Sequence, residues 1–237
     1  MHLWDIRQPD RPKSSFCSWT VGANQVKFNR LNEWTLATSH DTDVRIWDIR
    51  MGSAPTTLIT AHMKKINGID WSRRVDSEIL TCSQDGSIKL WDINSPDASF
   101  AEILTGIPIW RARYTPFGNG VVSMPQRKDN NLYLWDMRSG ASNNVPVHTF
   151  SGHFDTPTEF VWRFNRISLS EDESDYQLIT WSKDNHLRMW PVTREVTKVF
   201  LRINLVGWTR PAKAQIKFRK RNFFQLCGFK ILFDAKY

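Results

Sequence analysis

One short tryptophan-containing sequence recurs along this chain and constrains its fold more than any other feature. Successive copies read HLWDIR, RIWDIR, KLWDIN and YLWDMR, and RMWPVT is a weaker fifth copy. The spacings between their tryptophans are 43, 44, 44 and 55 residues. A period in the low forties is typical of a β-propeller, in which each repeat forms one four-stranded blade. The marking residues are Trp4, Trp47, Trp91, Trp135 and Trp190.

An aspartate repeats in phase with these tryptophans. It lies six residues before each of the last four, at Asp41, Asp85, Asp129 and Asp184. Stretches such as SIKLWDI alternate polar and apolar residues, as half-buried strands do. Repeats that end in Trp-Asp are called WD repeats. We therefore predict an all-β WD-repeat propeller. Each unit runs strand, turn, strand, Asp-bearing turn, a strand ending in Trp-Asp, and a fourth strand.

WD repeats use a hydrogen-bonded set of His, Ser or Thr, Asp and Trp to clamp three strands of a blade. Two units of this chain carry all four residue types. The first predicted set is His62, Ser83, Asp85 and Trp91. The second is His153, Ser182, Asp184 and Trp190. A buried His–Asp pair stabilises a blade only if both groups find partners, so we expect these two blades to be the firmer ones.

The two other units have incomplete sets. The unit ending at Trp47 keeps Ser39 and Asp41 but has Trp19 at the histidine position. The unit ending at Trp135 keeps Asp129 but has Thr105 and Arg127 in place of His and Ser. We expect these blades to be looser.

The number of marks predicts an incomplete propeller. Trp4 ends a unit whose first two strands are missing, which leaves one partial and four fuller blades. We expect residues 1–195 to form this propeller fragment and residues 196–237 to form a basic, aromatic tail without repeat phase. We also expect the chain to be a piece of a longer protein.

The stretches between the marks resemble one family. From residue 2 to residue 194 the chain is similar to the WD-repeat subunit of the SEA/GATOR nutrient-signalling complex, which also carries an RWD domain and a RING. The stretches that carry this resemblance are GANQVKFN (22–29), LATSHDTDVRIWD (36–48), IPIWRARYTPFGNG (107–120), MPQRKDNNLYLWD (124–136), PVHTFSGH (146–153) and DYQLITWSKDNHLRMW (175–190).

The resemblance implies a role as well as a fold. It implies an expected seven blades and a non-enzymatic scaffold in amino-acid signalling that regulates TOR complex 1. It implies other propeller subunits of the SEA/GATOR complex as partners, with no small-molecule substrate. It also implies a cytoplasmic location peripheral to the lysosome or vacuole membrane, with only indirect membrane association.

The residues offer little for catalysis or metal binding. Ser151, His153 and Asp155 are triad residue types, but they are too close in sequence to converge on a substrate, and His153 has a predicted structural role. The cysteines are too far apart for a zinc half-site; they are Cys17, Cys82 and Cys227. The other histidines lack ligand spacing, and we expect surface or turn positions for His2, His40, His148 and His186. We expect no catalytic residue, cofactor or metal.

The net charge of +8 is confined to the end of the chain. Residues 201–237 hold nine Lys/Arg and one Asp, whereas residues 1–200 hold 23 of each sign. This distribution argues against nucleic-acid binding by the propeller. It leaves one alternative function, in which KFRKRNFFQLCGFK at 217–230 binds RNA or an anionic membrane.

A second alternative comes from the repeat marks themselves. WDIR at 47–50 and WDMR at 135–138 resemble the Trp-Asp-x-Arg box of propellers that act as substrate receptors of cullin ubiquitin ligases. Ile46 and Leu134 supply the aliphatic residue before the tryptophan. The acidic insert EDESD at 171–175 is predicted to be a solvated loop between two strands, or else a docking loop for a basic partner.

Overall fold

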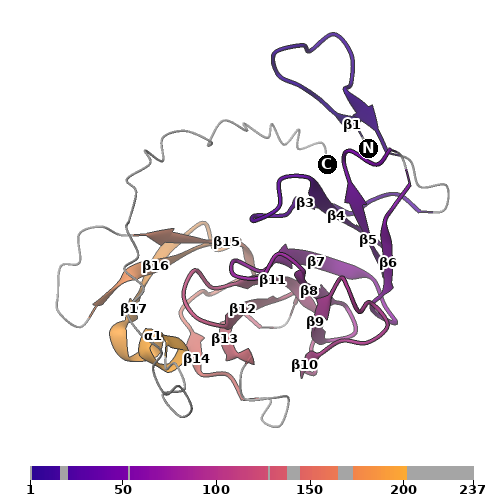
Figure 1. The fold of residues 1–237 in the computed structure, drawn as a ribbon. Helices are drawn as coiled ribbons and strands as arrows, with labels where there is room; N and C mark the ends of the chain where they lie inside the picture. Colours follow the sequence, from indigo (N-terminus) through magenta and orange to yellow (C-terminus); the bar gives the residue numbers. More distant parts are fainter. Residues whose placement is uncertain are drawn as a thin grey trace, which may run out of the picture. The chain divides into compact units, whose positions relative to one another are not determined.

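Antiparallel sheets follow one another along the chain (Figure 1). A computed structural model describes residues 2–16, 21–52, 54–127, 129–137, 145–164 and 173–201. The first sheet has only two short strands and is called the partial blade. Its strands are β1 (His2–Leu3) and β2 (Ser14–Ser15).

Four larger sheets follow, and each strand pairs with its neighbour in sequence. Blade 1 contains β3 (Gln25–Phe28), β4 (Thr35–His40), β5 (Asp43–Asp48) and β6 (Thr57–Thr60). Blade 2 contains β7 (Ile66–Trp71), β8 (Glu78–Ser83), β9 (Ser87–Asp92) and β10 (Ala101–Leu104). Blade 3 contains β11 (Ile109–Tyr114), β12 (Gly120–Pro125), β13 (Leu132–Asp136) and β14 (His148–Phe150). Blade 4 contains β15 (Pro157–Phe164), β16 (Glu173–Ser182) and β17 (Leu187–Thr193).

The predicted all-β architecture is confirmed, and so is its incompleteness. The described residues form one partial and four fuller blades, one of them with three strands. The acidic insert departs from its prediction. Its last three residues belong to β16, which begins at Glu173, so they are strand rather than loop. Residues 171 and 172 lie outside the described residues.

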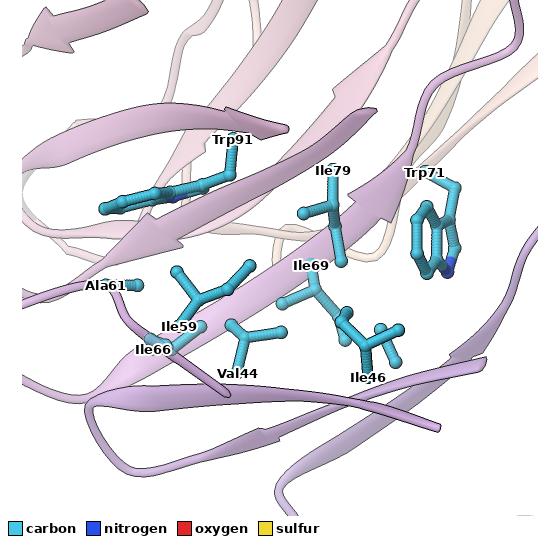
Figure 2. Close-up of a cluster of buried hydrophobic side chains, with 10 residues drawn as sticks. Val44, Ile46, Ile59, Ala61, Ile66, Ile69, Trp71, Ile79 and Trp91 are labelled. Atoms are coloured by element: carbon cyan, nitrogen blue, oxygen red, sulfur yellow. The ribbon is translucent and has the colours of Figure 1, made fainter. Parts of the chain in front are cut away.

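Adjacent blades pack face to face through apolar side chains. Figure 2 shows Val44 and Ile46 of blade 1 opposite Ile69 and Ile79 of blade 2. Strand pairing explains the arrangement, because residues directly opposite one another on neighbouring strands share a face. Ile79 pairs with Trp91, and both are buried in this interface. Full burial of each such side chain contributes about 1.5–3 kcal/mol.

Hydrogen bonds also tie the first strands of successive blades. The side-chain amide of Gln25 on β3 donates to the carbonyl of Asn67 on β7 at 2.6 Å. The side chain of Asn67 then donates to the carbonyl of Ile109 on β11 at 2.7 Å. The same contact therefore recurs at a step of 42 residues. Arg113 continues the series by donating to the carbonyl of Phe160 on β15 at 2.7 Å.

Asp70 on β7 joins three blades. One carboxylate oxygen lies 2.8 Å from Nη2 of Arg30 in blade 1, and the other accepts the backbone N–H of Tyr114 in blade 3 at 3.1 Å. The side chain is 1% exposed. Burial raises the pKa of Asp70, against the opposing effect of the Arg30 guanidinium. A buried carboxylate of this kind is tolerated because both oxygens have donors.

Blade 4 leaves exposed the face with which the earlier blades pack against their successors. Leu187 and Met189 lie three residues and one residue before Trp190, as Ile88 and Leu90 do before Trp91. Ile88 and Leu90 are 0% and 3% exposed, whereas Leu187 and Met189 are 55% and 56% exposed. Among the described residues no further blade follows blade 4 to cover this apolar face, as expected for an incomplete propeller.

A helix follows the last strand. Helix α1 (Arg194–Leu201) spans the predicted boundary between residues 195 and 196. Phe200 is buried, and its ring centroid lies 5.8 Å from that of Phe117. Gly118 permits the close approach, because its φ is +57° and a Cβ there would overlap Phe200. The division into two regions stays a prediction, but α1 packs with the blades.

Candidate functional site

The most organised polar cluster of the described residues lies in blade 2. His62, in the connection before β7, places Nδ1 2.9 Å from Oδ2 of Asp85 in the β8–β9 turn. Its Nε2 lies 2.7 Å from the hydroxyl of Thr81. Trp91 donates its indole N–H to the same hydroxyl at 3.0 Å. Because a carboxylate only accepts, Nδ1 of His62 carries the proton, and Thr81 donates to Nε2.

The structure thus brings His62, Asp85 and Trp91 together, but the bridging hydroxyl belongs to Thr81 and not to Ser83. Ser83 instead donates to the carbonyl of Lys64 at 3.0 Å and accepts the N–H of Asp85 at 3.2 Å. It therefore shapes the turn. Strand periodicity puts both residues on one face of β8, so sequence alone does not separate them. The spacing from the bridging hydroxyl to the tryptophan is ten residues in blades 2 and 4 but nine in blade 1 and twelve in blade 3, so it gives no general signal.

Electrostatics within this cluster favour a neutral histidine and an ionised aspartate. Burial lowers the pKa of His62, although Asp85 opposes the shift. Burial would raise the pKa of Asp85, but hydrogen bonds from the hydroxyl and N–H of Ser87 and the contact with His62 lower it. The Ser87 bonds are 2.7 and 2.9 Å long. This arrangement holds the strands of the blade together.

Blade 4 repeats the cluster. Nδ1 of His153 lies 2.9 Å from Asp184, and its Nε2 lies 2.7 Å from the hydroxyl of Thr180, which Trp190 reaches at 2.9 Å. Thr180 again replaces the predicted serine, because Ser182 donates to the carbonyl of Asp155. Burial would raise the pKa of Asp184, but the bond from His153 and those from two backbone N–H groups lower it well below its ordinary range.

Blade 1 completes its cluster with a histidine for which a surface or turn position was predicted. His40 is 5% exposed, and its Nε2 lies 2.8 Å from the hydroxyl of Thr38. Trp47 donates to that hydroxyl at 2.8 Å, so Thr38, rather than Ser39, is the bridge. Nδ1 of His40 lies 2.8 Å from the carbonyl of Val21. Trp19 lies outside the described residues.

The turn after β4 still uses its predicted aspartate. Asp41 has a φ of 51°, a left-handed conformation that Asp tolerates better than most residues. Its carbonyl accepts the N–H of Ile66 in blade 2 at 2.6 Å.

Blade 3 has the poorest cluster, as its sequence suggested. Trp135 donates to Ser123 at 2.7 Å. Among the described residues, Asp129 bonds within its own turn and strand, to the hydroxyl of Tyr133 at 2.5 Å and the N–H of Asn131 at 2.9 Å. Thr105, at the histidine position, donates to the carbonyl of Gly86 at 2.8 Å. No side chain of the described residues takes the place of the histidine here.

The arginines that follow Trp-Asp in the repeat sequences bond to the aspartate two residues before them. Trp4 is 49% exposed. Arg50 is bidentate on Asp48, with Nε at 3.0 Å and Nη2 at 2.7 Å, and it lies over the Trp34 ring. Arg7 binds Asp5 in the same way. Arg7 and Arg50 thus pair with the aspartate of their own Trp-Asp-x-Arg sequence. Arg138 lies outside the described residues.

Comparison with known proteins agrees with this architecture. Residues 53–92 match the family model for the WD domain, G-beta repeat. The chain is 43% identical over 202 residues, 84% of its length, to the human GATOR2 complex protein WDR59. It belongs to the WD-repeat family of WDR59. An RWD, RING finger and WD repeat-containing protein of Schizosaccharomyces pombe is 43% identical over 201 residues, 83% of this chain. Maintenance of telomere capping protein 5 of Saccharomyces cerevisiae is 38% identical over 206 residues, also 83% of this chain.

These relatives are much longer than the present chain. It spans 20% of human WDR59, 15% of the S. pombe protein and 18% of the S. cerevisiae protein. Within the described part of the chain, no cluster of three or more His, Cys, Asp or Glu is arranged to hold a metal ion. In the same part, no helix has the length and apolar character needed to cross a membrane.

Proposed function

We propose that this chain is a non-enzymatic protein-interaction scaffold of a GATOR2-type complex. The observation that carries the proposal is its 43% identity to a GATOR2 complex protein over 84% of its own length. The architecture supports it. The polar clusters hold the strands of each blade together. Side chains such as Asn67 and Asp70 join neighbouring blades, so the blades form a rigid support for exposed loops. Rigid scaffolds that present loops are well suited to binding other proteins.

The finer parts of the proposal follow from the family resemblance. We propose that the partners are other propeller subunits of the complex, and that the complex acts in amino-acid signalling to TOR complex 1. The same resemblance supports a cytoplasmic location peripheral to the lysosome or vacuole membrane, reached through partners. An apolar exposed face such as that of blade 4 is a feature of surfaces that other protein segments cover.

Affinity purification tests the proposal. A tagged full chain, expressed in cells of its source, is expected to recover the propeller subunits of the complex in constant proportion. The variant Thr60→Val, altered at an exposed site on β6, serves as a control that is expected to recover the same subunits. A chain whose circular dichroism shows intact strands but which recovers none of these subunits contradicts the proposal.

The ligase-receptor alternative gives a different result in the same experiment. It predicts recovery of a cullin adaptor that is lost in Arg50→Ala. The scaffold proposal predicts no effect of this variant on the recovered subunits, because Arg50 is engaged with Asp48.

A further inference from the structure

A hollow of 220 Å³ lies at the junction of blades 2 and 3. It is at the opposite ends of the strands from the His62–Asp85 pair. One wall comes from the β7–β8 connection and includes Arg73, Arg74 and Glu78. The other wall comes from the end of β11 and the β11–β12 connection and includes Tyr114. Leu90 and Phe100 contribute apolar surface.

Tyr114 gives the hollow an unusual feature. The residue is 6% exposed, and its ring packs in the apolar cluster between the two blades. Its buried hydroxyl has no hydrogen-bond partner among the described residues. Nearly all buried polar groups of native proteins are paired, so this hydroxyl is an exception in the wall of the hollow.

The charges around the hollow select for an anion. Neither Arg73 nor Arg74 forms an ion pair within the described ranges, and Arg74 makes only a 3.5 Å contact with Asn119. Glu78 is the one carboxylate among the lining residues. The balance of two guanidinium groups against one carboxylate favours a negatively charged group. Phe100, which is 54% exposed, offers an apolar surface beside these charges.

The next junction along the chain shows what such a place accepts. At the junction of blades 3 and 4, Phe200 of α1 packs against Phe117 of the β11–β12 connection, in a cluster that includes Trp162 (α1 is orange in Figure 1). In blade 4, Trp162 lies opposite Leu178, which lies opposite Trp190. In blade 3, Tyr114 lies opposite Val121, which lies opposite Trp135. Trp162 and Tyr114 therefore occupy equivalent positions in their blades. An aromatic side chain presented by a separate element therefore fills the corresponding junction.

We propose that the hollow between blades 2 and 3 binds a short segment of a partner protein that carries a carboxylate next to an aromatic side chain. The aromatic group packs against Leu90 and Phe100. The carboxylate pairs with Arg73 and Arg74. This inference goes beyond the proposed function and does not depend on which complex the chain joins.

The test uses the full chain and a small probe, 3-(4-fluorophenyl)propionate, observed by ¹⁹F NMR. Its uncharged amide, 3-(4-fluorophenyl)propanamide, is the matched control ligand. A dissociation constant in the low millimolar range is expected for a ligand of this size. The carboxylate is expected to bind about tenfold more tightly than the amide, because its hydrogen bonds are charge-assisted. Equal binding of the two ligands, or no binding of the carboxylate at about 20 mM, overturns the proposal.

Variants locate the binding. Arg74→Ala is expected to lower the affinity for the carboxylate about tenfold, because the ligand loses one of its two cationic partners. Glu78→Gln is expected to strengthen binding, because it removes the one carboxylate of the lining. Arg50→Ala is the matched control, since Arg50 pairs with Asp48 and neither residue lines the hollow. Unchanged affinity in Arg74→Ala overturns the proposal, whereas failure to recover GATOR2-type subunits bears only on the proposed function.

Discussion

At the residue scale, blades 1, 2 and 4 each depend on a hydroxyl that serves two partners at once. Thr81 and Thr180 are fully buried and lie between an imidazole nitrogen and an indole N–H. A buried donor that loses its acceptor keeps the full cost of desolvation, which exceeds the average net value of a hydrogen bond. The clusters therefore matter more through what their loss leaves unpaired than through the energy of any one bond.

Replacement of Thr81 tests this view directly. Thr81→Val keeps the shape of the side chain but leaves Trp91 without an acceptor and His62 without a donor. The free energy of unfolding is expected to fall by about 1–3 kcal/mol. Denaturant titration of the full chain measures it, with Thr60→Val, a change of the same type at an exposed position of β6, as the control. Equal effects of the two variants contradict the bridging role.

Aspartates at equivalent positions are expected to differ in importance. Asp85→Ala leaves Nδ1–H of His62 and the hydroxyl of Ser87 without their acceptor in a largely desolvated site, at a cost of about 1–3 kcal/mol. Asp129→Ala leaves the hydroxyl of Tyr133 and the N–H of Asn131 without their acceptor, but both residues are half-buried and free to bond water, so the loss is smaller. Urea titrations of both variants compare them, and equal losses refute the account of the poorer cluster in blade 3.

Acid is expected to weaken the fold through the protonation of His62. Burial lowers the pKa of His62, so below the ordinary value of about 6.5 the unfolded state binds more protons than the folded state. The contribution of His62 is complete above that pH and is lost as the pH falls, with a slope of at most about 1.4 kcal/mol per pH unit. Unfolding free energies between pH 7.5 and pH 5 check this prediction. His62→Gln is expected to show a shallower slope, although His40 and His148 shift in the same direction and keep theirs.

At the element scale, helix α1 matters because one side chain on it closes a junction between blades. Phe200 is 2% exposed and lies in the cluster that joins blades 3 and 4. Val199, its neighbour on the helix, is 39% exposed. The helix thus acts on the blades through a narrow apolar stripe, and most of its surface is free of this role.

Truncation of that side chain is expected to loosen blade 4. Phe200→Ala removes a buried ring that Phe117 contacts, and the loss of stability is expected to be about 3–5 kcal/mol if the junction does not collapse. Val199→Ala, on the same helix, is expected to cost much less. Amide hydrogen exchange of β16 and β17 reports the change locally. Unchanged protection in Phe200→Ala shows that the helix is dispensable for the blades.

At the scale of the whole molecule, the net charge is concentrated at one end of the sequence. The described blades contain paired ions such as Asp70 with Arg30, while the positive excess of the sequence lies beyond residue 200. Residues 203–237 hold eight Lys/Arg and one Asp, a net of +7, so the remaining chain has a net charge of +1. We therefore expect electrostatic attraction to membranes rich in anionic lipids to come mainly from that segment.

Deletion of residues 203–237 tests whether this segment carries the attraction to anionic membranes. The full chain is expected to bind vesicles rich in phosphatidylserine at low salt. The binding is expected to weaken steeply as the salt concentration rises, because binding releases counterions and this release is less favourable at high salt. The deleted chain is expected to show no such binding. Co-sedimentation at several salt concentrations measures both. Binding by the deleted chain with the same salt slope would reveal a basic patch on the blades, for example around Arg111 and Arg127.

The sequence by itself determined the repeat, the strand order and the residues His62, Asp85 and Trp91. It did so because a blade is built from contacts within one period, where strand alternation and turn residues are directly visible. The tertiary structure decided the rest. Thr81 and Ser83 share a strand face, so only the placed indole shows which hydroxyl it reaches. His40 and Phe200 have no repeat phase, and their roles arise from packing between segments that the linear pattern does not relate.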